Sequence, residues 1–140
     1  LGYELALKGL FLQVIFLLLQ YSTKQVKNAA RGGTPSDKLK NVLDYIEIHY
    51  AKTISVEELA KICCFSEYHF MRFFKKHMNM TCVEYVNNVR LEKAVELFEQ
   101  GNTSILEVSL SVGFHNLSYF HRAFKNKYGM TPRSFIKELK

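Results

Sequence analysis

An internal repeat constrains this chain more than any other feature of its sequence. The segment from Ser55 to Thr81 returns as the segment from Ser104 to Thr131. Each copy has the pattern of a short helix, a tight turn and a second helix rich in aromatic and basic residues. The repeat therefore predicts two copies of one helical unit on a single chain. Phe70, Arg72, Phe74, Lys75, Met80 and Thr81 recur as Phe120, Arg122, Phe124, Lys125, Met130 and Thr131.

The composition favours an all-α fold in a reducing compartment. Among 140 residues there are two prolines and seven glycines, and apolar residues rarely alternate as they do in strands. The three cysteines, Cys63, Cys64 and Cys82, form neither a CxxC pair nor an even disulfide set. We therefore predict an all-helical protein of the cytoplasm.

The chain divides into three predicted segments. Residues 1–21 are almost all apolar and predict an amphipathic or partner-packing helix, because the strongest run, Leu10 to Leu19, is half the roughly 20 residues that span a bilayer. Residues 22–35 contain Gly32 and Gly33 and predict a linker. Residues 36–140 predict a seven-helix domain. Within it we place a first helix-turn-helix at about 55–78, a linker helix at about 82–100 and a second helix-turn-helix at about 104–128.

Start and stop signals mark most of the predicted helix ends. Ser36 is a candidate N-cap for the first helix of the domain. Gly101 and Gly129 are expected to end two helices, and Thr131-Pro132 to begin the last one. Capping boxes, in which a side chain and a backbone satisfy each other, are predicted for Ser55 with Glu58, Thr81 with Glu84, and Ser104 with Glu107.

The two predicted turns differ at one critical position. Gly113 suits a turn that needs positive φ, and Cys64 takes that place in the first copy. A side chain there opposes the same tight turn. The second turn also has one more residue than the first.

Positive charge is concentrated on both copies of the repeat. No Asp or Glu occurs from Tyr68 to Val83, which includes Arg72, or from Val108 to Lys137, which includes Arg122. The acidic residues lie in the intervening helices. This separation is typical of a face that binds a polyanion.

The second helix of each copy presents one apolar and one polar face. By helical spacing, Phe70, Phe73 and Phe74 should be core, as should Phe120, Ala123 and Phe124. The opposite faces carry Tyr68, Met71, Arg72, Lys75 and Lys76 in the first copy, and Ser118, His121, Arg122 and Lys125 in the second. The major groove of DNA admits an α-helix, arginine can donate two hydrogen bonds to guanine, and lysines neutralise phosphates. The linker helix, about 28 Å long, could hold two such helices in grooves roughly 34 Å apart.

The second copy and the linker helix carry a further ordered set of residues: Val112-Gly113-Phe114, Ser118-Tyr119-Phe120, Arg122, Phe124-Lys125, Gly129 and Thr131-Pro132, with Tyr85, Arg90-Leu91 and Ala94 in the linker helix. In this set, the chain resembles the DNA-binding domain of the AraC/XylS family of bacterial transcription regulators. The match covers about residues 37–140. Asn79 departs from the family's usual glycine, and Ile136 from its common arginine.

The resemblance implies a sequence-specific regulator that inserts two recognition helices into adjacent major grooves. The implied base contacts are Tyr68, His69, Met71, Arg72, Leu117, Ser118, His121 and Arg122. The expected phosphate contacts are Ser66, Lys75, Lys76, Asn116, Lys125 and Arg133. Activation and repression both stay open.

The expected partners are double-stranded DNA, RNA polymerase and a second copy of the chain. The segment Leu1–Tyr21 resembles the dimerising helix at the end of the family's N-terminal sensing domain, so it is the expected dimer contact. No catalytic residue, cofactor, metal site or membrane partner is predicted.

Two other kinds of site fit the sequence less well. A metal site drawn from Cys63, Cys64, His69, His77 and Cys82 lacks a recognised ligand spacing. A catalytic Cys–His pair lacks an orienting acid and an oxyanion device. The alternative function is a basic helical module that docks on a protein partner or an anionic membrane surface.

Overall fold

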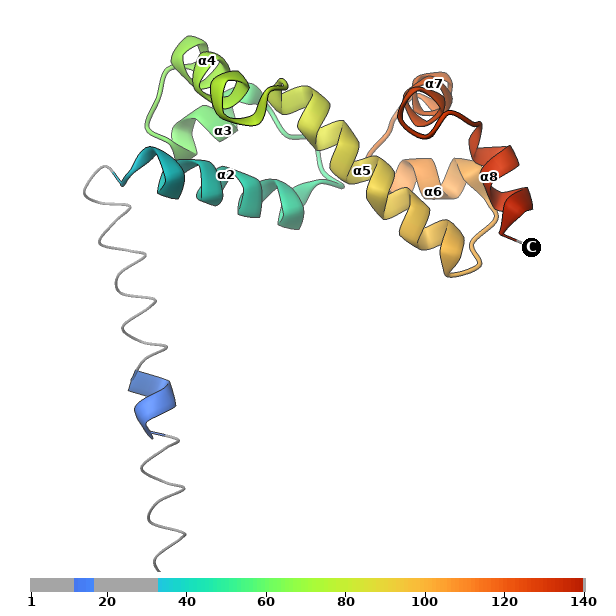
Figure 1. Ribbon diagram of the computed structural model, residues 1–140, viewed down its shortest axis with the longest axis horizontal. Helices are drawn as coiled ribbons and strands as arrows, with labels where there is room; N and C mark the ends of the chain where they lie inside the picture. Colours follow the sequence, from blue (N-terminus) through green and yellow to red (C-terminus); the bar gives the residue numbers. More distant parts are fainter. Residues whose placement is uncertain (1–11, 17–32, 140) are drawn as a thin grey trace, which may run out of the picture. The chain divides into compact units, whose positions relative to one another are not determined.

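The computed structural model describes residues 12–16 and 33–139, and every regular element among them is an α-helix (Figure 1). Residues 12–16 are helical and exposed; the rest of the predicted segment 1–21, and residues 22–32 of the predicted linker, lie outside the described residues. The all-α prediction is confirmed. From residue 35 onward the helices are α2 (Pro35–His49), α3 (Val56–Ile62), α4 (Glu67–Met78), α5 (Cys82–Glu99), α6 (Ile105–Ser111), α7 (Leu117–Tyr128) and α8 (Pro132–Glu138).

The start of α2 differs from the prediction by two residues. Thr34, and not Ser36, caps this helix: its hydroxyl accepts the Asp37 backbone N–H at 3.2 Å. The Asp37 carboxylate accepts the Thr34 backbone N–H at 3.2 Å in return. Thr34 prevails because Pro35 then occupies the first helical position, where its fixed φ and missing N–H cost nothing.

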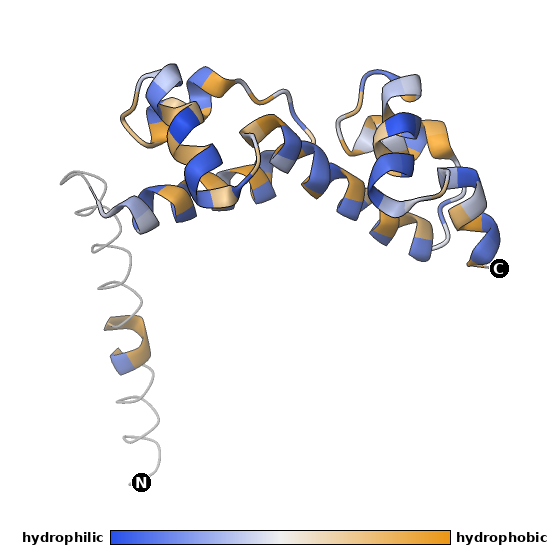
Figure 2. Ribbon diagram, turned by 45° about the horizontal axis from the view of Figure 1, so that its top comes forward, coloured by the Kyte–Doolittle hydropathy of each residue, from blue (hydrophilic) through white to orange (hydrophobic). Residues whose placement is uncertain are grey.

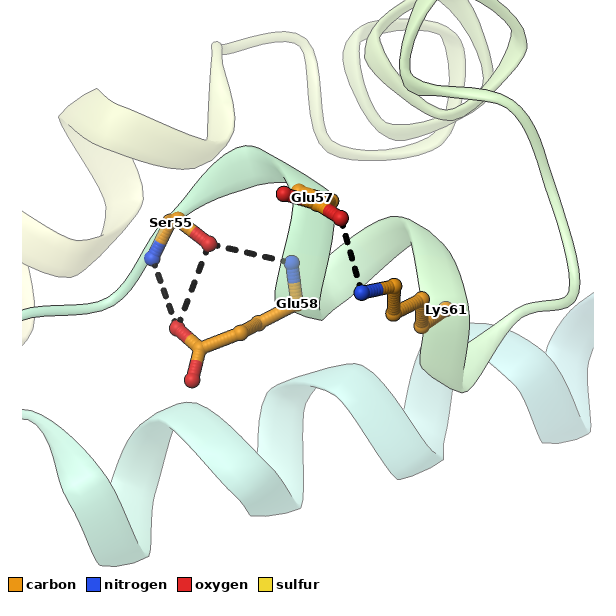
Figure 3. Close-up of polar contacts among 4 residues, drawn as sticks. All are labelled: Ser55, Glu57, Glu58 and Lys61. Carbon is orange, nitrogen blue, oxygen red and sulfur yellow. Dashed lines mark hydrogen bonds and ion pairs between the residues drawn. The ribbon is translucent and has the colours of Figure 1, made fainter.

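Two of the three predicted capping boxes are complete. Ser55 Oγ accepts the Glu58 N–H at 3.1 Å, and the Ser55 N–H donates to the Glu58 carboxylate at 2.9 Å (Figure 3). Thr81 and Glu84 form the same pair, and the Thr81 N–H bond holds the pKa of Glu84 below its ordinary value. The stabilisation from Glu84 is therefore present at neutral pH and is lost as the pH falls through that lowered pKa.

The third predicted capping box is wrong in one half. Ser104 Oγ accepts the Glu107 N–H, but the Ser104 N–H donates to Asn102 Oδ1 at 3.2 Å. The side-chain amide of Asn102, two residues upstream, supplies the acceptor, so Glu107 is not needed to satisfy this donor.

The two helix-turn-helix turns are closed by the same backbone hydrogen bond. Phe65 N–H donates to Ala60 O at 3.0 Å, and Phe114 N–H donates to Ser109 O at 2.9 Å. Cys64 has a φ of 55° and Gly113 a φ of 99°. Cys64 therefore adopts the left-handed conformation that its side chain opposes, and the first turn is as tight as the second.

Each helix-turn-helix has its own core. Phe70 and Phe74 are fully buried in the first cluster, where they pack with residues of α2, α3 and the start of α5. Phe120 and Phe124 are fully buried in the second cluster with the end of α5. Ile136 packs against the second cluster, which explains an apolar residue at that place.

Helix α5 contributes to both cores with different faces. Its first half buries Cys82, Val86 and Val89 in the first cluster, and its second half buries Leu91, Ala94 and Phe98 in the second. At about 100° per residue the two stripes lie about 150° apart around the helix axis. Apolar and polar residues are consequently mixed along α5 and not confined to one side (Figure 2).

None of the helices within residues 12–16 and 33–139 is long and apolar enough to cross a bilayer.

We predict that Cys64→Gly stabilises the protein by about 0.5–1 kcal/mol. Glycine adopts positive φ without the steric cost of a side chain, a gain partly offset by its greater freedom in the unfolded state. The Cys64 side chain is exposed, so little packing is lost. Urea denaturation monitored by circular dichroism measures the change.

Gly113→Ala is the matched reverse substitution. An added Cβ would lie 2.9 Å from Tyr50 O and from Ala51 O, so this variant should lose stability. A destabilised Cys64→Gly protein would show that the first turn is not strained.

Candidate nucleic-acid interface

Helix α4 separates its core face from its polar face as predicted. Phe70, Phe73 and Phe74 are buried. Its outer face, which we define as Tyr68, Met71, Arg72, Lys75 and Lys76, is exposed. His69 is exposed as well, although its ring packs edge-on against Phe65 at 4.2 Å between centroids.

Helix α7 has the corresponding arrangement with one difference. Its outer face, which we define as Leu117, Ser118, His121, Arg122 and Lys125, is exposed except for His121. The His121 side chain is half-buried, and its ring centroid lies 6.2 Å from that of Phe120. The core residue Ala123 is also only half-buried, because it replaces the larger Phe73 of the first copy.

Ser66 and Asn116 are the N-caps of α4 and α7. Ser66 Oγ accepts the His69 N–H at 3.3 Å, and Asn116 Oδ1 accepts the Tyr119 N–H at 2.8 Å. The serine hydroxyl and the asparagine amide keep their own hydrogens available, since both groups act here as acceptors. Both side chains therefore offer donors beside a helix N-terminus, which attracts anions.

Each outer face has an arginine held against a tyrosine. Arg72 donates to the Tyr68 hydroxyl at 3.2 Å, and its guanidinium lies 5.7 Å from the centre of that ring. The Arg122 guanidinium lies 5.4 Å from the ring centre of Tyr119. Such contacts reduce the number of arginine rotamers, so both guanidinium groups are partly preorganised.

Tyr119 is the residue that sequence reasoning left out of the site. Besides contacting Arg122, its hydroxyl accepts a hydrogen bond from the Asn87 side chain of α5 at 2.9 Å. A tyrosine three residues before the arginine lies on the same side of a helix, and this spacing could have identified it.

Among the described residues, the cations of both outer faces form no ion pair with a carboxylate, although Lys75 lies near enough to Glu84 to help lower its pKa. The ion pairs in the described part of the chain are Lys61–Glu57, Lys93–Glu96 and Lys127–Glu92. Lys127, on α7 but outside its outer face, is thus used internally, and it also donates to Asn88 O at 3.3 Å. Arg72, Lys75, Lys76, Arg122, Lys125 and Arg133 are exposed and remain available to an external anion.

The described residues contain no group of three or more His, Cys, Asp or Glu that could hold a metal ion. Cys63 and Cys82 are buried, and Cys64 is exposed. Burial raises the pKa of the Cys82 thiol and so disfavours its reactive thiolate.

Comparisons with known proteins identify the family. A family described as a helix-turn-helix domain matches residues 59–138, more than half of the chain. The uncharacterised HTH-type transcriptional regulator YdeC of Bacillus subtilis (strain 168) is 35% identical over 102 residues. That match covers 73% of this chain and 35% of YdeC, so the chain spans about a third of this relative's length.

Solved structures share the fold. A transcriptional regulator with an AraC-type DNA-binding domain from Chromobacterium violaceum matches with a TM-score of 0.68 at 24% identity, over 74% of this chain and 93% of that one. The DNA-binding domain of the global transcriptional factor AdpA, solved with a target DNA, matches with a TM-score of 0.67 at 23% identity, over 71% and 90%. The chain therefore belongs to the AraC/XylS family of DNA-binding transcriptional regulators.

Proposed function

We propose that α4 and α7 enter two adjacent major grooves on one face of double-stranded DNA and read its sequence. The observation that carries this proposal is the matched pair of exposed arginines, Arg72 and Arg122, each held against a tyrosine. Arginine at such a place can donate two hydrogen bonds to guanine O6 and N7. The DNA-binding domain of AdpA, which has a similar fold, was solved in complex with a target DNA.

The length of α5 supports two heads in adjacent grooves. We call α3 with α4 the first head and α6 with α7 the second head. Helix α5 has 18 residues, which gives a length of about 27 Å. Adjacent major grooves on one face are about 34 Å apart, a separation that two heads at the ends of such a helix can span.

The proposed base contacts differ between the heads. They are Tyr68, His69, Met71 and Arg72 in the first head and Leu117, Ser118, His121 and Arg122 in the second. Met71 and Leu117 are exposed apolar side chains, which suit a thymine methyl. Met71 of the first copy corresponds to His121 of the second, and Tyr68 to Ser118, so the two halves of the target should differ in sequence.

The proposed phosphate contacts surround these positions. They are Ser66, Lys75, Lys76, Asn116, Lys125 and Arg133. The four cations form no ion pair with a carboxylate among the described residues, and the two caps offer donors beside helix N-termini. Such contacts supply affinity for any DNA sequence and make binding salt-dependent.

We also propose two partners through which binding affects transcription in the bacterial cytoplasm. One is RNA polymerase. The other is a second copy of the chain, bound through Leu1–Tyr21. Leu12, Val14 and Phe16 of this segment are exposed, which supports an apolar contact.

Selected DNA should bind far more tightly than random DNA. We expect a duplex obtained by binding-site selection to exceed a random duplex by at least about 1,000-fold at moderate salt. Affinity for both should fall linearly on a log–log plot against salt, because phosphate contacts release counterions. Fluorescence anisotropy measures both quantities, and equal affinity for the two duplexes would contradict sequence-specific reading.

Substitutions should separate base contacts from phosphate contacts. Arg72→Ala or Arg122→Ala should cost about 1–3 kcal/mol and relax the base preference of one half-site. Lys75→Ala should weaken binding to all sequences alike and reduce the salt slope by about one. Lys61→Ala, which removes an exposed cation of α3 that already pairs with Glu57, is the matched control and should change neither. Uniform losses from all three test variants would contradict the assignment.

Deletion of residues 1–21 should abolish self-association. The full chain should sediment as a concentration-dependent dimer in analytical ultracentrifugation, because the exposed apolar residues are covered when two copies meet. The same monomeric profile with and without the segment would contradict this contact.

A further inference from the structure

Arg90 occupies a special place on α5. It lies between Val89, the last α5 residue buried in the first cluster, and Leu91, the first buried in the second. At about 100° per residue it also points about 75° away from each apolar stripe. One side chain on this helix thus lies midway between the two cores both along the axis and around it.

The guanidinium of Arg90 binds the segment that connects α2 with α3. Its Nε donates to Tyr50 O at 2.7 Å, and a terminal nitrogen donates to Lys52 O at 2.9 Å. The same group lies 5.9 Å from the ring centre of Phe114, in the turn of the second head. Arg90 therefore contacts both the connection between α2 and α3 and the turn between α6 and α7. The planar, forked guanidinium can make these contacts at once, whereas a lysine ammonium has no equivalent plane or fork.

Two further contacts close the junction between the heads. The Tyr50 side chain packs against both hydrophobic clusters. Gly113 lies so close that an added Cβ would be 2.9 Å from Tyr50 O, from Ala51 O and from Arg90 Nε. Glycine at this position thus serves the tight turn and also the close approach of the second head to the end of α2.

Apart from the contact with Phe114, the second head is attached to α5 without Arg90. Asn87 bonds the Tyr119 hydroxyl, and Lys127 pairs with Glu92 at 2.8 Å, so α7 is fixed to α5 by separate contacts. Phe120 and Phe124 form the buried core of this head. Substitution of Arg90 should therefore leave the second head folded. It should remove the bonds to Tyr50 O and Lys52 O, so that the first head can move relative to the second.

We propose that the junction of Tyr50, Lys52, Arg90, Gly113 and Phe114 fixes the distance and rotation between the two heads, so that Arg90 determines which half-site spacing the protein accepts. This inference rests on the proposed reading of two adjacent grooves. Arg90 acts as a positioning residue: it makes no contact with DNA in this account. If α5 alone connected the two heads, one head could rotate relative to the other. The junction is a second connection between them and opposes this rotation.

The test is a spacing profile. Affinity is measured by anisotropy for the selected duplex and for duplexes with one or two base pairs inserted or removed between the half-sites. The wild-type chain should lose about tenfold or more for each base pair, since each insertion turns one half-site by about 34° and moves it by about 3.4 Å. Arg90→Met keeps an apolar stem against Phe114 and removes both hydrogen bonds. Relative to the wild-type chain, the affinity of this variant should fall about tenfold for the selected duplex and much less for the duplexes with altered spacing. Its affinity should therefore depend less on spacing.

Controls separate positioning from general loss of structure. Lys93→Met removes another α5 cation, one paired with Glu96 outside the junction, and should keep the sharp wild-type profile. Arg90→Lys should give an intermediate profile and remains informative if Arg90→Met does not fold, as judged by thermal melting. Base preference within each half-site should be unchanged in every folded variant.

Two results would overturn the inference. If both Arg90 variants keep the sharp wild-type dependence on spacing, with affinity unchanged or lowered equally for all duplexes, the role of Arg90 is refuted. The two-groove proposal would then stay intact. A wild-type profile without spacing dependence would refute both proposals.

Discussion

The fold depends on α5 burying apolar residues on two nearly opposite faces. Val86 and Val89 complete the first core, and Leu91 and Ala94 complete the second. Each group of short helices completes its core with one half of α5, since a short helix must pack its apolar face against another element. One continuous helix thus supplies apolar surface to both cores. The same arrangement connects α4 to α7 through one shared helix, to which the bonds of Arg90 add a second connection.

Packing on this shared helix determines which side chains of α4 and α7 face solvent. Phe70 and Phe120 fix the rotation of α4 and α7 about their own axes, and so decide that Arg72 and Arg122 face solvent. Charge follows the same division, since the acids that pair with lysines lie on α3 and α5. Packing, charge separation and arginine placement therefore all agree with the binding of a polyanion by both repeats.

Local features were predictable from sequence, and long-range contacts were not. Helical periodicity and capping signals located the helices, because these depend on residues three or four positions apart. The cap at Thr34, the bond from Ser104 to Asn102 and the left-handed Cys64 are cases in which two local preferences compete. Arg90 was visible only as part of a family pattern. Its partner Tyr50 lies forty positions away, and no local spacing predicts that pairing.

The central claim, that one face of DNA is read by two heads on a shared helix, is tested most directly by hydroxyl-radical footprinting on a selected duplex. Two protected backbone patches are expected on each strand, centred about 10 base pairs apart, because adjacent grooves on the same face have that separation. Arg72→Ala should weaken protection chiefly in one patch and Arg122→Ala in the other. A single continuous patch, or two patches on opposite faces of the duplex, would contradict the account.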